Sequence, residues 1–270
     1  MNTTSAVTAP RAAPANATLL EASDLRIVVA GCVLVDSLTF SIEPGQCWAI
    51  VGRNGAGKTS LLRVLAGLAT PAGGAVRYGG RSVDMLGVRE RARHRSVLPQ
   101  DSHDAFPASV LQTVLVGRHP HVARFAWETE SDIACARDAL RTFGIAALAS
   151  RDVRTLSGGE RRRVALAALL AQDAPLALLD EPSSHLDVAQ QSSALAVFLD
   201  LARERNRAVV MVLHDLHLAT RFCDHAIAIG DGKATARPAS MILATEALST
   251  LFGCPLVELS GEGLRTFVPR

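Results

Sequence analysis

The sequence predicts an α/β protein built on a mostly parallel sheet. Short apolar runs typical of strands occur at residues 176–179, 208–213 and 226–229, and helical patterns separate them. Strands that alternate with helices favour a parallel sheet with helices packed on its faces. A further apolar run, at 48–51, leads into a glycine-rich loop and then into a helical pattern. We therefore expect a strand–loop–helix unit within this sheet.

The composition supports a large folded core and argues against two kinds of function. Of the 270 residues, 49% are hydrophobic, which is ample for one large domain or two lobes. The 28 Lys and Arg residues nearly balance the 26 Asp and Glu residues, so the net charge of +2 gives no electrostatic case for a dedicated nucleic-acid binder. The apolar stretches are far shorter than the roughly 20 residues of a membrane span, so a role at a membrane would require a partner protein. The five cysteines are scattered without metal-ligand spacing, which favours a reduced cytosolic protein.

The chain divides into one domain flanked by two short tails. Residues 1–18 are rich in Ala, Thr and Pro, and we expect a disordered tail there. The domain spans 19–260 and begins with short apolar runs, separated by turns, that are typical of strands. The segment of about 101–155 lacks strong strand signals, and its clearest helical stretch is 132–143, so we expect an inserted helical lobe. Residues 261–270 are expected to form a C-terminal tail.

Residues 52–59 form a complete phosphate-binding loop of the pattern G-x-x-x-x-G-K-[ST]. Its glycines allow the backbone to approach phosphates closely, and its N–H groups face the anion together with the N-terminus of the next helix. Lys58 can neutralise the outer phosphates, and the Thr59 hydroxyl can ligate Mg²⁺. The residues expected to bind the phosphates here are Gly52, Arg53, Asn54, Gly55, Ala56, Gly57, Lys58, Thr59 and Ser60.

A second motif, at residues 176–181, is an apolar strand that ends in the two acids Asp180 and Glu181. Burial on both faces explains the continuous apolar run, and the carboxyl end of a strand is where open α/β sheets place ligands. Asp180 is expected to hold Mg²⁺, directly or through water, and Glu181 to polarise an attacking water. Such a strand is weak evidence alone and becomes strong downstream of a complete phosphate loop.

A third motif consists of Leu156, Ser157, Gly158, Gly159 and Glu160, which we call the signature segment, and it leads into a helical pattern. Its backbone N–H groups would form another anion-binding helix N-terminus. An ordinary helix cap, with Ser157 as the capping residue, explains the same residues. The two interpretations are compatible with each other.

Three further positions are ordinary when taken singly: Gln100 after a short apolar segment, His214 at the end of an apolar run, and residues 184–187 just after Glu181. In their order and spacing, all these motifs together resemble the ATP-binding subunit of an ABC transporter over about residues 20–250. The resemblance implies a P-loop NTPase (RecA-like) core with a small antiparallel β-subdomain and an inserted α-helical subdomain. It also implies ATP and Mg²⁺ as cofactors, and ATP hydrolysis coupled to transmembrane transport.

The resemblance assigns a role to each residue around one ATP molecule. Lys58 and the loop backbone would hold the phosphates. Glu181 would be the general base or water-positioning group, and His214 would contact the γ-phosphate and hold the attacking water. Gln100 would sense the γ-phosphate and link the site to the helical lobe. The side chains expected to handle Mg²⁺ are Thr59, Gln100 and Asp180.

The resemblance further implies a head-to-tail homodimer that sandwiches two ATP molecules. Ser157 and Gly159 would reach the γ-phosphate of the ATP bound to the opposite subunit, and Gly158 and Glu160 belong to the same contact segment. Asp187 would lie at the dimer interface. The nucleotide site is therefore expected to be completed by a second copy of the chain.

Two positions depart from the family pattern. Residues 27–31 offer no aromatic side chain to stack on adenine, so the base would rest on aliphatic surface. Arg162 stands where many relatives carry Gln, and we expect a tolerated surface substitution there. The arginine-rich stretches 89–95 and 161–163 are best explained as solvated helix faces rather than as a nucleic-acid surface.

Other segments are similar to importers of cobalamin, haem and ferric siderophores, and residues 118–140 most resemble the cobalamin branch. The implied partners are a permease dimer in the membrane and, indirectly, a periplasmic or extracellular substrate-binding protein. The ATPase would then be peripheral, on the cytoplasmic face of the membrane. Phe106, Pro107 and residues 117–121 would lie near a groove that accepts a short permease helix. The segments that carry this resemblance are 106–110, 116–121, 214–219, 221–224 and 252–253.

Other functions of the same family remain open. An ATPase of DNA repair or translation is disfavoured, because the sequence has neither a long coiled coil nor a second cassette. An exporter subunit is permitted, although residues 106–121 favour import. A regulator that binds ATP without hydrolysing it is disfavoured because Glu181 and His214 are both present. The transported substrate, whether cobalamin, haem or a siderophore, is selected by partners that this sequence does not contain.

Overall fold

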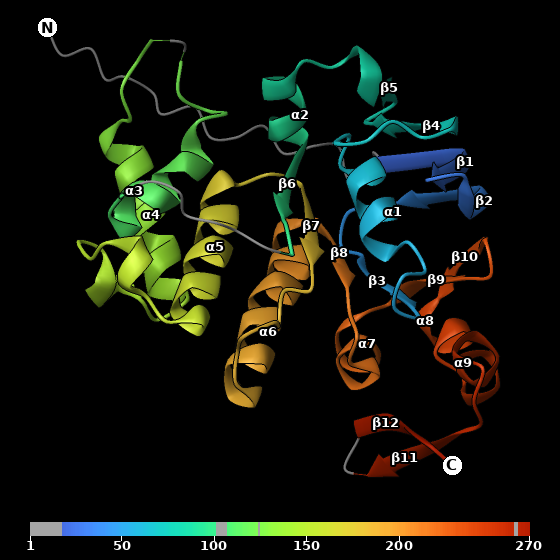
Figure 1. Ribbon diagram of the computed structural model, residues 1–270. Coiled ribbons are helices and arrows are strands. Elements are labelled where there is room, and N and C mark those ends of the chain that lie inside the picture. Colours follow the sequence, from blue (N-terminus) through green and yellow to red (C-terminus); the bar gives the residue numbers. More distant parts are fainter. Residues whose placement is uncertain (1–17, 101–106, 124, 262–263) are drawn as a thin grey trace, which may run out of the picture.

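The computed structural model describes residues 18–100, 107–123, 125–261 and 264–270. Its centre is a six-stranded sheet in the order β10-β9-β3-β8-β7-β6, in which neighbouring strands from β9 to β6 run parallel and β10 is antiparallel to β9 (Figure 1). The expected parallel α/β sheet is therefore confirmed. Its strands are β3 (Cys47–Gly52), β6 (Arg95–Leu98), β7 (Leu176–Asp180), β8 (Ala208–Val212), β9 (His225–Gly230) and β10 (Lys233–Pro238).

A second, antiparallel sheet has the strand order β2-β1-β4-β5. Helix α1 (Lys58–Leu65) contacts strand β1 of this sheet and strands β3, β7 and β8 of the central sheet. Its residues Leu61 and Leu65 are fully buried in the same apolar cluster as Ile50 of the central sheet and Leu20 of the antiparallel one. The phosphate loop, which begins this helix, is thereby fixed between two sheets. The strands are β1 (Leu20–Val29), β2 (Cys32–Ile42), β4 (Gly73–Tyr78) and β5 (Arg81–Ser82).

The two faces of the central sheet pack into two different cores. Along β3, Trp48 and Ile50 join the cluster around α1, whereas Cys47, Ala49 and Val51 join the cluster on the opposite face. This alternation follows from the two-residue period of a strand, and burial on both faces explains why β3 is apolar throughout. The helices that contribute to the opposite face include α5 (Gly158–Gln172), α6 (Val188–Arg205), α7 (Leu216–Phe222) and α8 (Ala239–Ile242).

The insert expected at about 101–155 contains short helices that pack against α5, as Figure 1 shows in green and yellow. Capping boxes define two of its helix starts: Ser109 exchanges hydrogen bonds with Gln112, and Thr129 does so with Asp132. Phe106 lies outside the described residues. The helical elements of this part are α3 (Val110–Leu115), η2 (Val116–Arg118), α4 (Glu130–Thr142), η3 (Ala146–Leu148) and η4 (Val153–Thr155), and those before it are η1 (Val83–Met85) and α2 (Val88–His94).

The last part of the chain is more ordered than its sequence suggests. After α9 (Thr245–Phe252), strands β11 (Leu256–Gly261) and β12 (Leu264–Pro269) form an antiparallel hairpin. Strand β12 packs on α7, and the Arg265 carbonyl oxygen lies 3.0 Å from Nδ1 of His217. Most of the expected 261–270 tail is thus a strand. The expected 1–18 tail lies outside the described residues except for Thr18. Among the helices of the described ranges, none combines the length and apolarity needed to cross a membrane.

Candidate functional site

The phosphate loop lies between the end of β3 at Gly52 and the start of α1 at Lys58. Glycine is required at both ends of the loop. A Cβ atom on Gly52 would lie 2.3 Å from the Ile229 carbonyl oxygen, and Gly57 has a left-handed φ of 104° with a Cβ position 2.9 Å from the Leu34 side chain. No larger residue fits either position without moving the backbone or its neighbours. The tight turn leaves the N-terminus of α1 open, which is the arrangement that binds phosphate.

Lys58 lies within the curve of this loop. Its side chain is 6% exposed, and its Nζ donates hydrogen bonds to the carbonyl oxygens of Gly52 and Arg53, each at 3.0 Å. Burial lowers the pKa of Lys58, and the nearby carboxylates of Glu181 and Asp180 oppose that shift. The ammonium therefore lies near the two acids at the carboxyl end of β7, Asp180 within the strand and Glu181 directly after it.

Asp180 is the more deeply buried of the two acids, at 2% exposed. Burial raises its pKa, and a hydrogen bond from the Thr59 side chain and the charges of Arg162 and Lys58 act in the opposite direction. One of its oxygens, Oδ1, has no hydrogen-bond partner within the described residues. A buried carboxylate oxygen without a partner, next to a threonine hydroxyl, fits a hard cation such as Mg²⁺.

Glu181 joins the two other expected catalytic residues through one atom. Its Oε1 accepts a hydrogen bond from Nε2 of Gln100 at 3.1 Å and lies 2.7 Å from Nε2 of His214. Gln100 follows β6, Glu181 follows β7 and His214 follows β8, so the three side chains come from the carboxyl ends of adjacent parallel strands. Glu181 has a left-handed φ of 49°, which is rare for a non-glycine residue and typical of a functional position.

One cavity of about 740 Å³ is lined by Lys58, Thr59, Gln100, Glu181 and His214, and Asp180 is not part of its wall. Six of the nine residues expected to bind the phosphates contribute to its wall, and Gly52, Arg53 and Ala56 do not. Val29 and Leu34 contribute aliphatic side chains to the wall. The lining residues are Val29, Leu34, Asn54, Gly55, Gly57, Lys58, Thr59, Ser60, Gln100, Glu181 and His214.

The signature segment lies apart from this cavity. Ser157 caps α5: its hydroxyl accepts from the Glu160 backbone N–H at 3.3 Å, and its hydroxyl and backbone N–H each donate to the Glu160 carboxylate at 2.8 Å. The two hydrogen bonds to the carboxylate lower the pKa of Glu160. Asp187 caps α6 with its carboxylate, which accepts from the Gln190 backbone N–H at 2.8 Å. Ser157, Gly158 and Asp187 are exposed and are not part of the cavity wall, so their expected contact with ATP across a dimer stays a prediction.

Arg162 contradicts the expectation of a surface substitution. Its side chain is 4% exposed, and Arg95, in the other arginine-rich stretch, is 9% exposed. The Arg162 guanidinium donates to backbone carbonyl oxygens of the two loops that carry Gln100 and Glu181. A sequence signal was available, because Arg162 precedes the buried Leu166 by four residues, the spacing of one helix face.

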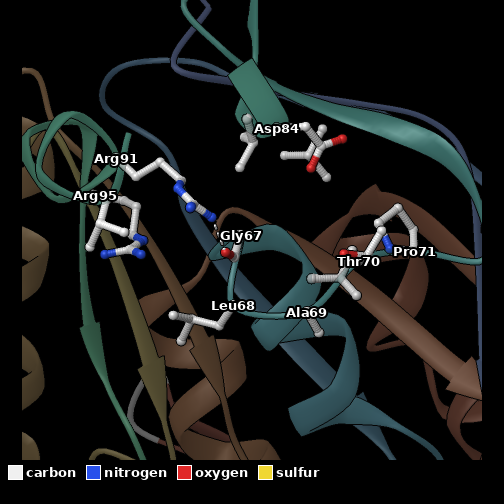
Figure 2. Close-up of a pocket in the computed structure, with 12 residues that line it drawn as sticks. Gly67, Leu68, Ala69, Thr70, Pro71, Asp84, Arg91 and Arg95 are labelled. Carbon is white, nitrogen blue, oxygen red and sulfur yellow. Dashed lines mark hydrogen bonds between the residues drawn. The ribbon is translucent and has the colours of Figure 1, made fainter. Parts of the chain in front are cut away.

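A second cavity, of about 440 Å³, lies at the other end of α1 (Figure 2). Two of its arginines point at the end of the helix, where Arg91 Nη1 donates to the Gly67 carbonyl and Arg95 Nε donates to the Ala66 carbonyl at 2.8 Å. Burial lowers the pKa of Arg95. Positive side chains at the C-terminus of a helix satisfy its free carbonyl groups, so these two arginines have a structural role here.

A family model described as ABC transporter matches residues 35–184, more than half of the chain. The chain belongs to the ABC transporter family. This membership confirms the expected P-loop NTPase fold with its antiparallel and helical parts, and it places the chain among the ATP-binding subunits of transport ATPases.

Three relatives carry import or transport names. A Cobalamin import ATP-binding protein (BtuD) of Halobacterium salinarum is 44% identical over 79% of this chain, and this chain spans 53%, about half, of that relative's length. A Hemin import ATP-binding protein (HmuV) of Gloeobacter violaceus is 41% identical over 88% of this chain and 93% of its own. A Ferric enterobactin transport ATP-binding protein (FepC) of Escherichia coli is 36% identical over 87% of this chain and 88% of its own. The predicted membership in the cobalamin, haem and siderophore importer group is therefore confirmed.

A solved structure supports the same assignment. A chain of an ABC transporter described as of the metal-chelate type, in an inward-facing conformation, superposes with a TM-score of 0.81. The two sequences are 29% identical, and the superposition covers 94% of this chain and 98% of the other.

Proposed function

We propose that this chain binds and hydrolyses ATP with Mg²⁺ and thereby powers the import of cobalamin or a related metal chelate. One observation carries the proposal: the Glu181 carboxylate, contacted by both Gln100 and His214, lies in the same cavity as the phosphate loop. Haem is the second candidate substrate, because the haem import relative is similar over nearly its full length.

ATP would be held by its phosphates. The open N-terminus of α1 and the loop N–H groups would bind the phosphate oxygens, and the Lys58 ammonium would leave the carbonyls of Gly52 and Arg53 for the outer phosphates. Thr59, Asp180 and Gln100 would hold Mg²⁺, which would offset the negative charge of the phosphates. Adenine would pack on Val29, which is 47% exposed at the cavity wall, and on Leu34. Aliphatic contacts do not read the edge of a base, so selectivity among purine nucleotides would be low.

Hydrolysis would use Glu181 together with the two side chains that contact it, Gln100 and His214. A water molecule attacks the γ-phosphorus, the bond from phosphorus to the bridging oxygen breaks, and ADP leaves with the electron pair of that bond. Glu181 orients the water and accepts its proton, while His214 holds the water and the γ-phosphate. Gln100, bonded to the same oxygen of Glu181, reports on the γ-phosphate to the helical insert. Most of the rate enhancement in phosphoryl transfer comes from such positioning and charge stabilisation.

A second copy of the chain would complete the site. The exposed start of α5, with Ser157 and Gly158, and the exposed Asp187 are available for a head-to-tail homodimer. In that arrangement the signature segment of one subunit contacts the ATP of the other. Hydrolysis would then require two chains, and the rate per chain should rise with protein concentration.

The membrane partner would dock on the helical insert. A cavity of about 260 Å³ lies between β6, α3 and α5, and its wall includes Gly117, the first residue of the segment 117–121 that we expect to dock the permease, and Val116 just before it. Arg118 within that segment is pinned by an ion pair with Asp132 at 2.9 Å and by the Ala171 carbonyl, so it shapes the segment rather than reaching outward. We propose that a permease dimer binds here, on the cytoplasmic face of the membrane, and that a substrate-binding protein delivers the chelate to it.

Growth of a deletion strain would test the function. Cells lacking this gene are grown with scarce cobalamin, haem or a ferric siderophore in separate cultures, and are complemented with wild-type protein or Glu181→Gln. We expect a defect on cobalamin alone, restored by wild type and not by Glu181→Gln. A defect on haem alone would change the substrate and keep the mechanism. Full restoration by Glu181→Gln would contradict hydrolysis as the source of power.

A further inference from the structure

The guanidinium of Arg162 is buried among backbone carbonyl groups of the two loops that form the catalytic end of the sheet. Its Nη1 donates to the carbonyl oxygens of Pro99 at 2.9 Å and Gln100 at 3.3 Å. Its Nη2 donates to those of Asp180 at 2.7 Å and Glu181 at 2.6 Å. One side chain therefore links the loop after β6 to the loop after β7.

Arginine is suited to this position by its shape. A guanidinium offers five N–H donors in a rigid planar fork, so it can satisfy carbonyls on two chain segments at once. Lysine has three donors on a single flexible atom, and glutamine has two. Burying a positive charge is unfavourable unless it is fully hydrogen-bonded. The carbonyl groups around Arg162 supply these hydrogen bonds. They can do so only while both loops keep their present positions.

The contact with Glu181 bears directly on the carboxylate. Glu181 has a left-handed backbone, which persists only where the surroundings enforce it. The short hydrogen bond from Arg162 Nη2 to its carbonyl oxygen supplies such a restraint. The side chain of the same residue contacts Gln100 and His214. A restraint on the backbone of Glu181 is thus a restraint on the direction of its carboxylate.

Arg162 also connects this end of the sheet to the signature segment. It lies on α5, which begins at Gly158 directly after the capping residue Ser157. An α-helix is stiff over so short a distance. The position of the exposed start of α5 is therefore tied, through Arg162, to the loops that carry Gln100 and Glu181.

We propose that Arg162 is a positioning residue for hydrolysis: it fixes Gln100 and Glu181 relative to each other and to the start of α5, without itself touching ATP. The inference rests on the proposed hydrolysis of ATP. The arginine at this position, where many relatives carry glutamine, therefore has a role in the catalytic loops and is not a surface substitution.

Arg207 provides a matched control, because it acts at the amino end of β7 whereas Arg162 acts at its carboxyl end. It precedes β8, donates to the Ala174 carbonyl at 3.2 Å and forms an ion pair with Asp173, all near the start of β7. Both are arginines that hold backbone carbonyls, and Arg207 is remote from the cavity wall.

The experiment compares full-length wild type with Arg162→Ala, Arg162→Lys, Arg162→Gln and Arg207→Gln. The kcat and KM for ATP are measured, together with amide hydrogen exchange in the nucleotide-free protein. The amides followed are those of Gln100, Glu181 and Ser183, because Arg162 contacts the carbonyl oxygen of the same peptide bond in each case. We expect Arg162→Ala to lower kcat by roughly 10²-fold, the scale of a small misplacement of catalytic groups, with KM changed less than about threefold. Lysine and glutamine should restore kcat in part, and exchange at the three amides should quicken in the order Lys or Gln, then Ala.

Three outcomes would overturn the inference. Wild-type kcat in folded Arg162→Ala would do so, as would an equal loss of kcat in Arg207→Gln, because the effect would then be general weakening of β7. If Arg162→Ala does not fold, wild-type kcat and unchanged exchange in Arg162→Lys would be decisive against it. If wild type itself does not hydrolyse ATP, the proposed function fails, and exchange at the three amides alone decides whether Arg162 holds the two loops.

Discussion

The two ends of helix α1 differ in how far the surrounding residues satisfy the polar groups there. At the N-terminal end, glycines keep the loop open, Lys58 donates to the loop carbonyls named above, and a buried oxygen of Asp180 has no hydrogen-bond partner among the described residues. At the C-terminal end, Arg91, Arg95 and Tyr78 donate to the carbonyls of the last turn and its continuation (Figure 2 labels the two arginines).

The difference teaches how one helix can serve binding and stability at once. A buried acceptor without a partner and a buried charge lower the stability of the fold unless a ligand satisfies them. Satisfied carbonyls raise stability and leave little for a ligand to gain. We therefore expect substitutions at the N-terminal end to change activity with little loss of stability, and those at the C-terminal end to do the reverse.

The largest effect is expected from Glu181→Gln at the N-terminal end. The amide cannot accept a proton, so kcat for ATP should fall by roughly 10²–10⁴-fold, the usual contribution of a positioned general base. Binding of ATP, followed by calorimetry, should stay within a few-fold of wild type. A variant that keeps most of its kcat would show that Glu181 is not the base.

The next effect is expected from Arg95→Ala at the C-terminal end. It leaves the buried Ala66 carbonyl without this donor and removes a well-packed side chain, so the free energy of unfolding should fall by about 1–3 kcal/mol. Urea denaturation measures that loss, and kcat per folded chain should be unchanged. A large fall in kcat without a fall in the free energy of unfolding would contradict the view that the C-terminal end of α1 serves stability rather than activity.

A smaller effect is expected from Tyr78→Phe at the same end. The Tyr78 hydroxyl donates to the Leu65 carbonyl at 2.5 Å, and burial raises its pKa to about 12. Removing the hydroxyl should cost about 1 kcal/mol, the usual net contribution of one hydrogen bond. Urea denaturation of the variant and of wild type, measured side by side, gives the difference. An unchanged unfolding energy would show that water replaces the hydroxyl.

The smallest effect on stability, and one of opposite sign, is expected from Asp180→Asn. The pKa of Asp180 is raised in the folded chain by burial, so the stabilisation by its neutral form is present at acid pH and is lost as pH rises through that raised pKa. Asparagine stays neutral at every pH. The variant should therefore gain stability over wild type as pH rises to 7, measured without Mg²⁺, while losing Mg²⁺-dependent hydrolysis. A variant less stable than wild type at pH 7 would contradict the pKa argument.

The sequence predicted the parts of the site that follow from local backbone requirements. The phosphate loop was recognisable because Gly52 and Gly57 must be glycine for steric reasons, and the strand before Asp180 because burial on both faces demands apolar residues. Gln100 and His214 were placed only by resemblance, since neither has a local pattern, and the sheet order brings them to Glu181.

What the sequence analysis missed depends on contacts between distant segments. Arg162 and Arg95 were interpreted from charge as solvated, and their burial depends on carbonyl groups that approach from other loops. Strand β12 was interpreted as a tail, because pairing with β11 and packing on α7 are what hold it. In each case the individual residues are polar or ambiguous, and the tertiary partner decides their environment.

The strand order of the central sheet has a consequence for synthesis of the chain. Strand β3 is made early, yet both of its neighbours in the sheet, β8 and β9, emerge from the ribosome more than 150 residues later. Until then its two edges are unpaired and its apolar faces are only partly covered, a condition that favours association with other chains. The phosphate loop cannot take its final shape during this interval, because Ile229 of β9 packs against Gly52. ATP therefore cannot bind to and stabilise a nascent chain until nearly all of the chain has been made.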